Sequence, residues 1–320
     1  MFLTLILTFA ILKPEFLPIH GFDGEAISQD GNWVIGSVRK RGHDRAALWN
    51  RSSGIMVLPL LPRFADGYPN FVSRDGSCVV GTCTSGKADA LRMDWFVWRR
   101  GKGTAKLFPG SSVQATAPAG AMTPPIESSP TWFMVDAMSA DGSTIAGGQY
   151  VRGPSGPVVG FYDQLNIGDV QPAAVSDDGK TLLLTHDLGP VGGGGNGAVP
   201  HKSESLVWSR RSGFVRFGKT GLVADAMSGD GTLFCGRDHG KLCRWNLAGN
   251  SEPLGGLGSN RNIAIKCMSA DGSTIVGGDL TSLMIWRKSL GMVALKGALL
   301  KRGLRGVARW KLQSCESVSG

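Results

Sequence analysis

The sequence predicts an all-β protein built from one small antiparallel sheet that is repeated along the chain. Three observations predict it: 47 Gly and 16 Pro among 320 residues, only 18% charged residues, and a short motif that returns six times. This composition excludes a coiled coil, a disordered acidic chain and a multi-span membrane protein. Many turn residues with scattered aromatic residues fit short strands better than long helices.

The repeated motif opens each unit with a β-hairpin. It consists of a small apolar stretch, Ser, one variable residue, Asp and Gly, and its copies lie about 48 residues apart on average. Gly accepts the positive φ of a tight turn and Asp hydrogen-bonds the turn backbone, so the motif predicts strand, turn and strand. The Asp-Gly pairs are Asp30 and Gly31, Asp75 and Gly76, Asp141 and Gly142, Asp178 and Gly179, Asp230 and Gly231, and Asp271 and Gly272.

A column of tryptophans marks a third strand in most copies. The tryptophans are Trp49, Trp98, Trp208, Trp245 and Trp286, with Phe161 and Tyr162 at this place in the third copy. A fourth apolar run follows a polar turn, as at Ile55–Leu58 and Met292–Leu295. Repeats of four antiparallel strands are the blades of a β-propeller, so the sequence predicts one propeller domain over residues 1–320. The Trp column is interpreted as packing between blades, not as a ligand-stacking surface.

The two ends of the chain predict how the ring closes. Trp310–Ser319 resembles the opening strand of a seventh copy, and Thr8–Leu12 with Phe16–Ile19 resembles the third and fourth strands of a blade. Pairing strands from both ends removes open sheet edges, which predicts seven blades, one of them composite. A ring of six blades with peripheral ends is the alternative. Because the last copy stops before its Asp, a truncated remnant without a function of its own is a further hypothesis.

Several segments interrupt the repeat. Residues 1–24 are interpreted as closing strands or as a degenerate signal segment, because Phe2–Leu12 is too short to span a bilayer and lacks a basic start and an Ala-x-Ala site. Residues 109–131 form a Pro/Ser-rich insertion and residues 189–202 a Gly-rich insertion, and both are expected to be mobile loops. Leu295–Leu304 is expected to form at most one short helix.

The net charge of +9 permits contact with anionic surfaces without specifying a partner. Near the C-terminus a single acid, Glu316, accompanies a group of basic residues. These are Lys296, Lys301, Arg302, Arg305, Arg309 and Lys311. Nucleic-acid binding would need interleaved aromatic side chains or a reading helix, and only Trp310 is present. The sequence therefore predicts no nucleic-acid partner; an unidentified protein or glycan is the expected partner.

Matches to ligand-binding patterns are interpreted as structural. Gly213–Thr220 reads GFVRFGKT, like a phosphate loop, but it occupies the position of a fourth strand and no helix is predicted after it. The repeated Asp residues are single acids in turns, whereas Ca²⁺ needs roughly six or more oxygen ligands. The sequence thus predicts no catalytic residue, no cofactor and no metal.

The histidines and cysteines show no metal-ligand spacing. The histidines do not recur at one repeat position and are expected in exposed loops; they are His20, His43, His186, His201 and His239. Cys235 and Cys243 flank Asp238–Gly240 symmetrically, so a disulfide across this hairpin is one hypothesis. Cys267 stands in a column otherwise held mostly by Ala and is expected to be a small buried thiol.

The repeat resembles that of the HAF-repeat proteins, a family of bacterial extracellular and surface proteins. The resemblance rests on Ser269–Gly278 (SADGSTIVGG), Met284–Trp286 and Gly291–Leu295, and it covers nearly all of residues 20–320. It implies an exported propeller without catalytic residues to carry over. The third copy departs from the pattern by lacking Trp, and the fourth lacks the Gly after its second strand. Asp178–Leu182 is also similar to the repeat of periplasmic TolB-type propellers, which bind proteins. The Asp-box of sialidases is similar only in its Ser-x-Asp start.

Two classes of function stay open. The first is a monomeric, non-enzymatic propeller that binds a protein or carbohydrate at the cell surface, outside the cell or in its envelope, with a cytoplasmic location as the alternative. It is favoured because the residues that recur in the six copies are those expected to form turns and to pack the blades. The second is a hydrolase or lyase with a site in the central channel, where Gly189–His201 would converge with His43 and Asp44.

Overall fold

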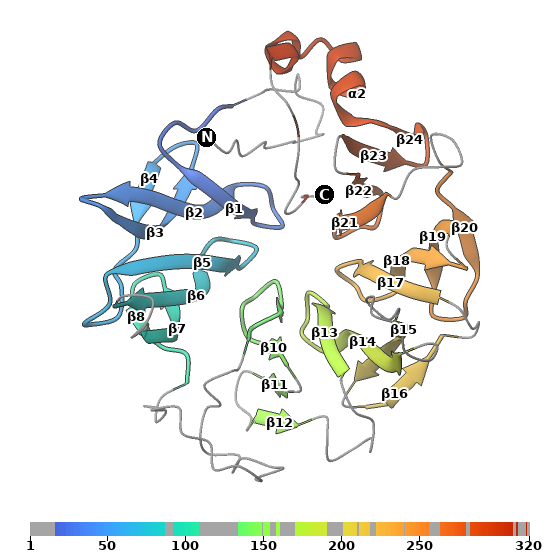
Figure 1. Cartoon of the computed structure of the whole chain (residues 1–320), viewed down its shortest axis with the longest axis horizontal. Helices are drawn as coiled ribbons and strands as arrows, with labels where there is room; N and C mark the ends of the chain where they lie inside the picture. Colours follow the sequence, from blue (N-terminus) through green and yellow to red (C-terminus); the bar gives the residue numbers. More distant parts are fainter. Residues whose placement is uncertain are drawn as a thin grey trace.

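The computed structural model is an all-β ring of six four-stranded antiparallel sheets, the blades of a β-propeller (Figure 1). It describes residues 17–86, 92–108, 134–148, 150–153, 158–160, 170–190, 201–209, 211–217, 222–239, 241–255, 263–279, 282–309, 312 and 318, and every structural statement concerns this part of the chain. Residues 1–16, the insertion at 109–131 and most of the insertion at 189–202 lie outside it. The expectations for these segments stay predictions.

The strands of each blade pair in chain order. The first and second blades contain β1 (Asp23–Ile27), β2 (Trp33–Lys40), β3 (His43–Asn50), β4 (Gly54–Val57), β5 (Asp66–Val72), β6 (Cys78–Ser85), β7 (Arg92–Arg99) and β8 (Gly103–Lys106). The third and fourth contain β9 (Ala137–Met138), β10 (Ile145–Gly147), β11 (Tyr150–Arg152), β12 (Val158–Gly160), β13 (Val170–Val175), β14 (Thr181–Pro190), β15 (His201–Ser209) and β16 (Gly213–Arg216). The fifth and sixth contain β17 (Leu222–Met227), β18 (Leu233–Asp238), β19 (Lys241–Asn246), β20 (Ser251–Pro253), β21 (Ala264–Met268), β22 (Thr274–Gly278), β23 (Leu283–Arg287) and β24 (Gly291–Ala294). Figure 1 shows β1, β5, β13, β17 and β21 nearest the centre of the ring.

The Ser-x-Asp-Gly turn has the same hydrogen bonds in all six blades. In the fifth blade the buried Ser228 Oγ donates to Asp230 Oδ1 at 2.6 Å and accepts from Leu233 N at 2.9 Å. Gly231 N donates to Ser228 O at 3.0 Å, and Gly231 has a φ of +72°, which an L-residue rarely adopts. The equivalent Ser-Asp hydrogen bonds join Ser28 to Asp30, Ser73 to Asp75, Ser139 to Asp141, Ser176 to Asp178 and Ser269 to Asp271. The motif therefore stabilises the turn between the first two strands of each blade.

The five repeated tryptophan side chains lie in hydrophobic clusters, four of which join neighbouring blades, whereas the cluster of Trp49 lies within the first blade and the segment before it. Trp98 of the second blade packs with Leu48 of the first, and Trp286 of the sixth packs with Cys235 of the fifth. The equivalent residues are Trp208, clustered with Val151 of the third blade, Trp245, clustered with Leu183 of the fourth, and Trp49, clustered with Phe22. Each side chain of this size buries roughly 150–250 Å² of surface, so the column contributes much of the blade-to-blade packing.

A short helical unit follows the sixth blade. α2 (Leu295–Lys301) continues from β24 and η2 (Arg305–Arg309) follows it. Figure 1 shows both on the arc between the sixth and first blades. Their apolar side chains join the cluster of Val276 and Ile285 in the sixth blade; they are Leu295, Leu299, Leu304 and Val307. The short helix expected within Leu295–Leu304 is thus present and ends at Lys301.

The third blade differs from the sequence prediction in its third strand. This strand is β11, at Tyr150–Arg152, and not a run that ends at Phe161 and Tyr162. The reason is the short connection after β10, since Gly147 already pairs with Tyr150. Phe161 and Tyr162 lie outside the described residues.

The hypothesis of a disulfide between Cys235 and Cys243 is wrong, since neither cysteine forms a disulfide. Asp238 pairs with Lys241, so the loop of this hairpin has two residues and not three. The register therefore places Cys235 opposite Arg244 and Cys243 opposite Gly236. Side chains at successive strand positions point to opposite faces of the sheet. Accordingly, Cys235 belongs to the cluster shared with the sixth blade and Cys243 to the one shared with the fourth.

Candidate functional site

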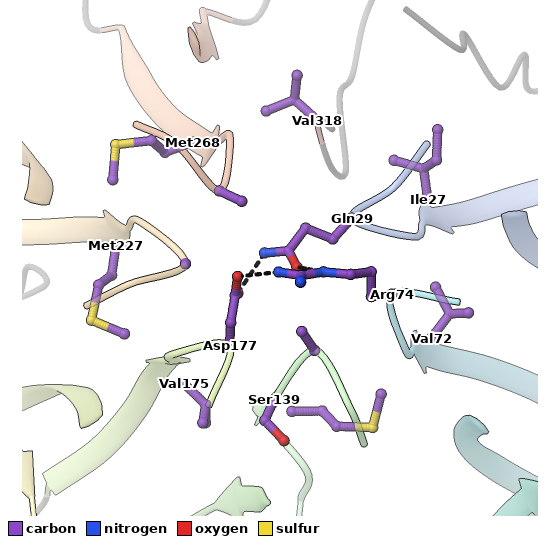
Figure 2. A pocket seen from close by; sticks show the side chains of 14 residues that line it. Ile27, Gln29, Val72, Arg74, Ser139, Val175, Asp177, Met227, Met268 and Val318 are labelled. Atoms are coloured by element: carbon purple, nitrogen blue, oxygen red, sulfur yellow. Dashed lines mark hydrogen bonds and ion pairs between the residues drawn. The ribbon is translucent and has the colours of Figure 1, made fainter. Parts of the chain in front are cut away.

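The variable residue of each Ser-x-Asp-Gly turn lies beside the axis of the ring. In chain order these residues are Gln29, Arg74, Ala140, Asp177, Gly229 and Ala270. With the residues that precede each Ser, they line a cavity of about 180 Å³, the axial cavity (Figure 2). All six described blades contribute to the lining, so the cavity exists because the ring brings the turns together.

Three polar side chains, the polar triad, meet at the axial cavity from the first, second and fourth blades (Figure 2). Arg74 Nη2 donates to Asp177 Oδ2 at 2.5 Å, and Arg74 Nε donates to Gln29 Oε1 at 2.7 Å. Gln29 Nε2 donates to Asp177 Oδ1 at 2.5 Å. Each carboxylate oxygen of Asp177 therefore has its own donor. The triad connects blades that are far apart in the sequence.

Small residues at the other variable positions let the turn backbones approach one another. Asp177 N donates to Gly229 O at 2.6 Å, and Gly229 N donates to Ala270 O at 2.8 Å. Arg74 N likewise donates to Ala140 O at 2.6 Å. A Cβ on Gly229 would lie 2.4 Å from Asp177 Oδ2, so a larger residue would displace the carboxylate. The residue at 229 is thus coupled to the residue at 177.

Apolar side chains form the rest of the cavity wall. They come from the position before each Ser and are Ile27, Val72, Met138, Val175, Met227 and Met268. Val318 joins them near the end of the chain (Figure 2). Methionine is flexible and polarizable, so it adapts to apolar groups of different shape. The axial cavity therefore combines an adaptable apolar wall with donors and acceptors on one side.

Ser139 and Asp177, two polar residues of the described lining, are held in hydrogen bonds within the protein. The Ser139 hydroxyl donates to Asp141 Oδ1 at 2.6 Å and accepts from Thr144 N at 2.9 Å, so it holds its turn together. Asp177 is engaged by Arg74 and Gln29. A nucleophile next to a general base, which covalent catalysis requires, is absent from the lining that the structure describes.

Five turn aspartates carry lowered pKa values because their carboxylates accept hydrogen bonds. The side-chain hydrogen bond from Ser77 contributes most to lowering the pKa of Asp75, and that from Ser176 contributes most at Asp178. At three further positions burial raises the pKa but hydrogen bonds from Ser, Thr and the backbone outweigh it: Asp141, Asp230 and Asp271. Ionised, hydrogen-bonded carboxylates of this kind stabilise turns.

Two carboxyl groups on or next to inner strands show the opposite shift. Burial raises the pKa of Asp136, which precedes β9, although Gly148 N donates to it at 2.8 Å. Burial also raises the pKa of Asp225 in β17, where the positive charges of Arg237 and Lys266 act against it. Neither residue lines the axial cavity.

A second polar cluster joins the first and second blades near the loops that follow β2 and β4. His43 Nδ1 lies 3.3 Å from Asp66 Oδ1, which also accepts from Asp44 N at 2.8 Å. Tyr68 Oη donates to Asp44 Oδ2 at 3.2 Å, and Arg39 Nη1 lies 3.1 Å from Asp44 Oδ1. Burial and the hydrogen bond to Asp44 raise the pKa of Tyr68, so its hydroxyl keeps its proton. Gly189–His201, which was expected to converge with this region, lies mostly outside the described residues.

The residues singled out by the repeat are not those that line the cavity. The lining includes none of the repeated Asp, Gly or Trp residues, which hold the hairpins and the blade interfaces. Sequence reasoning passed over Gln29, Arg74 and Asp177 because they stand at the position that the repeat leaves free. A comparison of this one position across the copies would have separated three polar residues from three small ones.

The expectation that the histidines lie in exposed loops is wrong at three positions, since His43 begins β3, His186 lies within β14 and His201 begins β15. His186 lies on β14, is 8% exposed and has its Nδ1 3.0 Å from Glu204 Oε1. Arg216 also contacts Glu204, at 3.2 Å. The prediction fails at His186 because β14 is unusually long. A polar residue that a shorter strand would leave in the following loop therefore lies within the strand. The phosphate-loop match contains β16 at Gly213–Arg216.

In the ranges that the structure describes, no three His, Cys, Asp or Glu side chains are grouped closely enough to hold a metal ion. Across the same residues, no helix has the length and apolarity needed to cross a membrane.

Known proteins were compared with this chain by sequence and by structure. No family model and no curated protein matches the sequence. Among solved structures, TolB from Acinetobacter baumannii is 13% identical, with 87% of this chain and 55% of that chain covered and a TM-score of 0.39. Dipeptidyl peptidase 4 from Porphyromonas gingivalis is 10% identical, with 85% and 46% covered and a TM-score of 0.49. Oligogalacturonate lyase from Vibrio parahaemolyticus is 12% identical, with 87% and 80% covered and a TM-score of 0.47.

The chain spans about half the length of the first two of these proteins. With identities of 10–13% and TM-scores below 0.5, these likenesses say nothing about the function of this chain. The resemblance to HAF-repeat proteins stays a prediction.

Proposed function

We propose that this protein is a non-enzymatic β-propeller scaffold that binds a partner protein at the axial cavity. The observation that carries the proposal is the difference between the framework and variable positions. Ser, Asp and Gly repeat in all six turns, whereas the variable position holds Gln29, Arg74 and Asp177 in only three of them. The repeated Ser, Asp and Gly residues are needed to form the turns. The polar triad is not needed for this, so its side chains are available to bind a partner.

The composition of the wall favours a protein ligand over a carbohydrate. Sugar rings are commonly bound against aromatic faces, and the described lining contains no aromatic residue. It offers Met138, Met227 and Met268, whose thioethers suit apolar side chains of varied shape. The polar triad adds donors and acceptors that suit a peptide group next to such a side chain.

The size of the cavity fits one side chain better than a whole small molecule. Its volume of about 180 Å³ is below the roughly 300–1,000 Å³ of pockets that enclose drug-sized ligands. We therefore propose that a partner inserts a single apolar residue, such as Leu or Met, into the axial cavity. The rest of the interface would lie on the surrounding turns.

The proposal also covers the number of blades, the family of the protein and its location in the cell. Val318 lines the cavity together with Met227 and Met268, which supports a seventh position in the ring, filled from the chain ends. We propose a composite seventh blade on this basis, with six blades as the alternative. Membership of the HAF-repeat family and a monomeric protein at the cell surface are part of the proposal, supported by the Ser269–Gly278 string.

Selection of peptides from a random display library tests the proposal. Ala270→Phe places a ring in the cavity, and Ala105→Phe adds the same ring to the exposed strand β8 as a matched control. We expect peptides that share an apolar residue, bind the native protein and the A105F variant, and lose at least about tenfold in affinity for the A270F variant. Enriched peptides that bind both variants equally, or no enriched peptides, would contradict the proposal.

The second polar cluster favours a second candidate, a hydrolase or lyase. His43 and Asp66 form a possible base with its orienting carboxylate, and the protonated Tyr68 lies next to Asp44 as a possible acid. Screening the purified protein on chromogenic glycoside, ester and uronate substrates tests this function. Turnover that is abolished by His43→Ala and Tyr68→Phe would support it, and turnover that is unchanged in both variants would reject it.

A further inference from the structure

The net positive charge of the protein is concentrated at its C-terminal end. Residues 280–320 contain eight Lys and Arg but one acid, Glu316, whereas the remaining residues contain 26 Lys and Arg and 24 Asp and Glu. The charge of the propeller is therefore nearly balanced outside this segment. The excess lies on and around α2 and η2.

The packing of α2 and η2 turns these cations toward solvent. Leu295, Leu299, Leu304 and Val307 are buried against the sixth blade. The intervening residues Lys301, Arg305 and Arg309 are exposed, and in the described part of the chain none of these three has an ion-pair partner. We call this exposed side the basic face. Within the described residues, this face therefore carries uncompensated positive charge.

An apolar side chain accompanies the charges on the basic face. Leu300 is 39% exposed and directly precedes Lys301. Exposed apolar residues next to Lys and Arg are typical of surfaces that lie on anionic bilayers, where the cations meet headgroups and the apolar group enters the acyl boundary. The described residues of α2 and η2 include no aromatic side chain for stacking on bases, which argues against a single-stranded nucleic acid.

We propose that the basic face of α2 and η2 binds the surface of a membrane that contains anionic phospholipids. The unit is anchored to the sixth blade by its buried leucines, so the face is already formed before contact. Binding through it would hold the whole propeller at the bilayer without a membrane-spanning segment. This peripheral attachment is independent of the axial cavity and of its ligand.

Sedimentation with lipid vesicles tests the proposal on the full chain. The probes are vesicles of phosphatidylcholine alone and of phosphatidylcholine with phosphatidylglycerol. We expect binding to the anionic vesicles only, with an affinity that falls as salt is raised. Lys301→Glu, Arg305→Glu and Arg309→Glu together should lower the affinity at least about tenfold, because each cation near such a surface contributes to binding.

A matched triple variant separates the basic face from net charge. Lys102→Glu and Arg211→Glu in turns, with Lys241→Glu at the start of β19, reverse three exposed cations of other blades and change the net charge equally. This control should keep most of the binding, and Leu300→Ala should lower it in the native background. Equal loss in both triple variants, equal binding to neutral vesicles, or binding to a single-stranded oligonucleotide without binding to anionic vesicles would overturn the proposal.

Discussion

Arg74 Nη2 lies 2.5 Å from Asp177 Oδ2 although 103 residues separate them in the chain. Gln29 completes the contact by donating to Asp177 from 148 residues away. Side chains from the first, second and fourth blades therefore meet at the axis, at a position that the repeat does not constrain. The polar triad depends on the circular arrangement of the blades.

The coupling between Arg74 and Asp177 is measurable by a double-mutant cycle. Arg74→Met and Asp177→Asn each break the ion pair while keeping the approximate length of the side chain. Because the two side chains are 53% and 27% exposed, we expect a coupling free energy of unfolding of about 0.5–1 kcal/mol. Urea unfolding of both single variants and the double variant gives this value. Strict additivity of the two substitutions would show that the contact is absent in solution.

Gly229→Ala is expected to destabilise the protein by about 1–3 kcal/mol, since the new Cβ would overlap the Asp177 carboxylate. The same substitution should cost much less in a protein that carries Asp177→Ala. Gly297→Ala is the control, because a Cβ there meets nothing within 4 Å and Ala favours the helix. Denaturant midpoints of the native protein, the three single variants and the double variant check this. An identical cost of G229A with and without Asp177 would be evidence against the observed approach.

Acid is expected to weaken the fold through the turn aspartates. The pKa values of Asp75 and Asp178 lie below the usual 3.8, so their stabilising effect is present above that pH and is lost as the pH falls through the lowered values. Asp75→Asn with Asp178→Asn should reduce stability at pH 7 and flatten its decline below about pH 4. Thermal midpoints between neutral and acidic pH compare the two proteins. Parallel pH curves would show that these carboxylates do not contribute.

Trp286→Ala is expected to cost about 3–5 kcal/mol of the free energy of unfolding. Trp286 is 3% exposed, and the Arg244 guanidinium of the neighbouring blade lies 4.8 Å from its ring centroid. The loss should therefore come from the interface between the fifth and sixth blades. Leu290→Ala, at a side chain 42% exposed in the same blade, should change stability by less than about 0.5 kcal/mol. Similar effects of the two substitutions in guanidinium unfolding would refute the packing role of the Trp column.

The regular part of the fold could be predicted from sequence because local chemistry determines it. Asp30 and Gly31 predict a turn by themselves. Six copies of this pair at equivalent repeat positions predict the repeated blades of a propeller. Trp98 could be assigned to blade packing because a large apolar residue at a fixed repeat position needs a neighbouring sheet. These features require no knowledge of distant contacts.

The features that differ from blade to blade could not be predicted, because they depend on strand pairing and on contacts between residues far apart in the sequence. Cys235 and Cys243 seemed symmetric about a turn, but a loop one residue shorter places them on opposite faces. His186 is buried beside Glu204 on a strand that extends beyond its equivalents. The contact between Arg74 and Asp177 has no local signal in the sequence, since only the circular arrangement of the blades brings the two turns together.

Methyl NMR of the protein labelled on its methionines tests the central claim most directly. The sequence has ten Met, of which Met138, Met227 and Met268 line the axial cavity, while Met56 and Met93 are exposed on β4 and β7. Titration with a peptide selected as described above should shift the signals of Met138, Met227 and Met268 and leave those of Met56 and Met93 in place. Signals that shift at Met56 or Met93 while the three cavity signals stay unchanged would contradict binding at the axis.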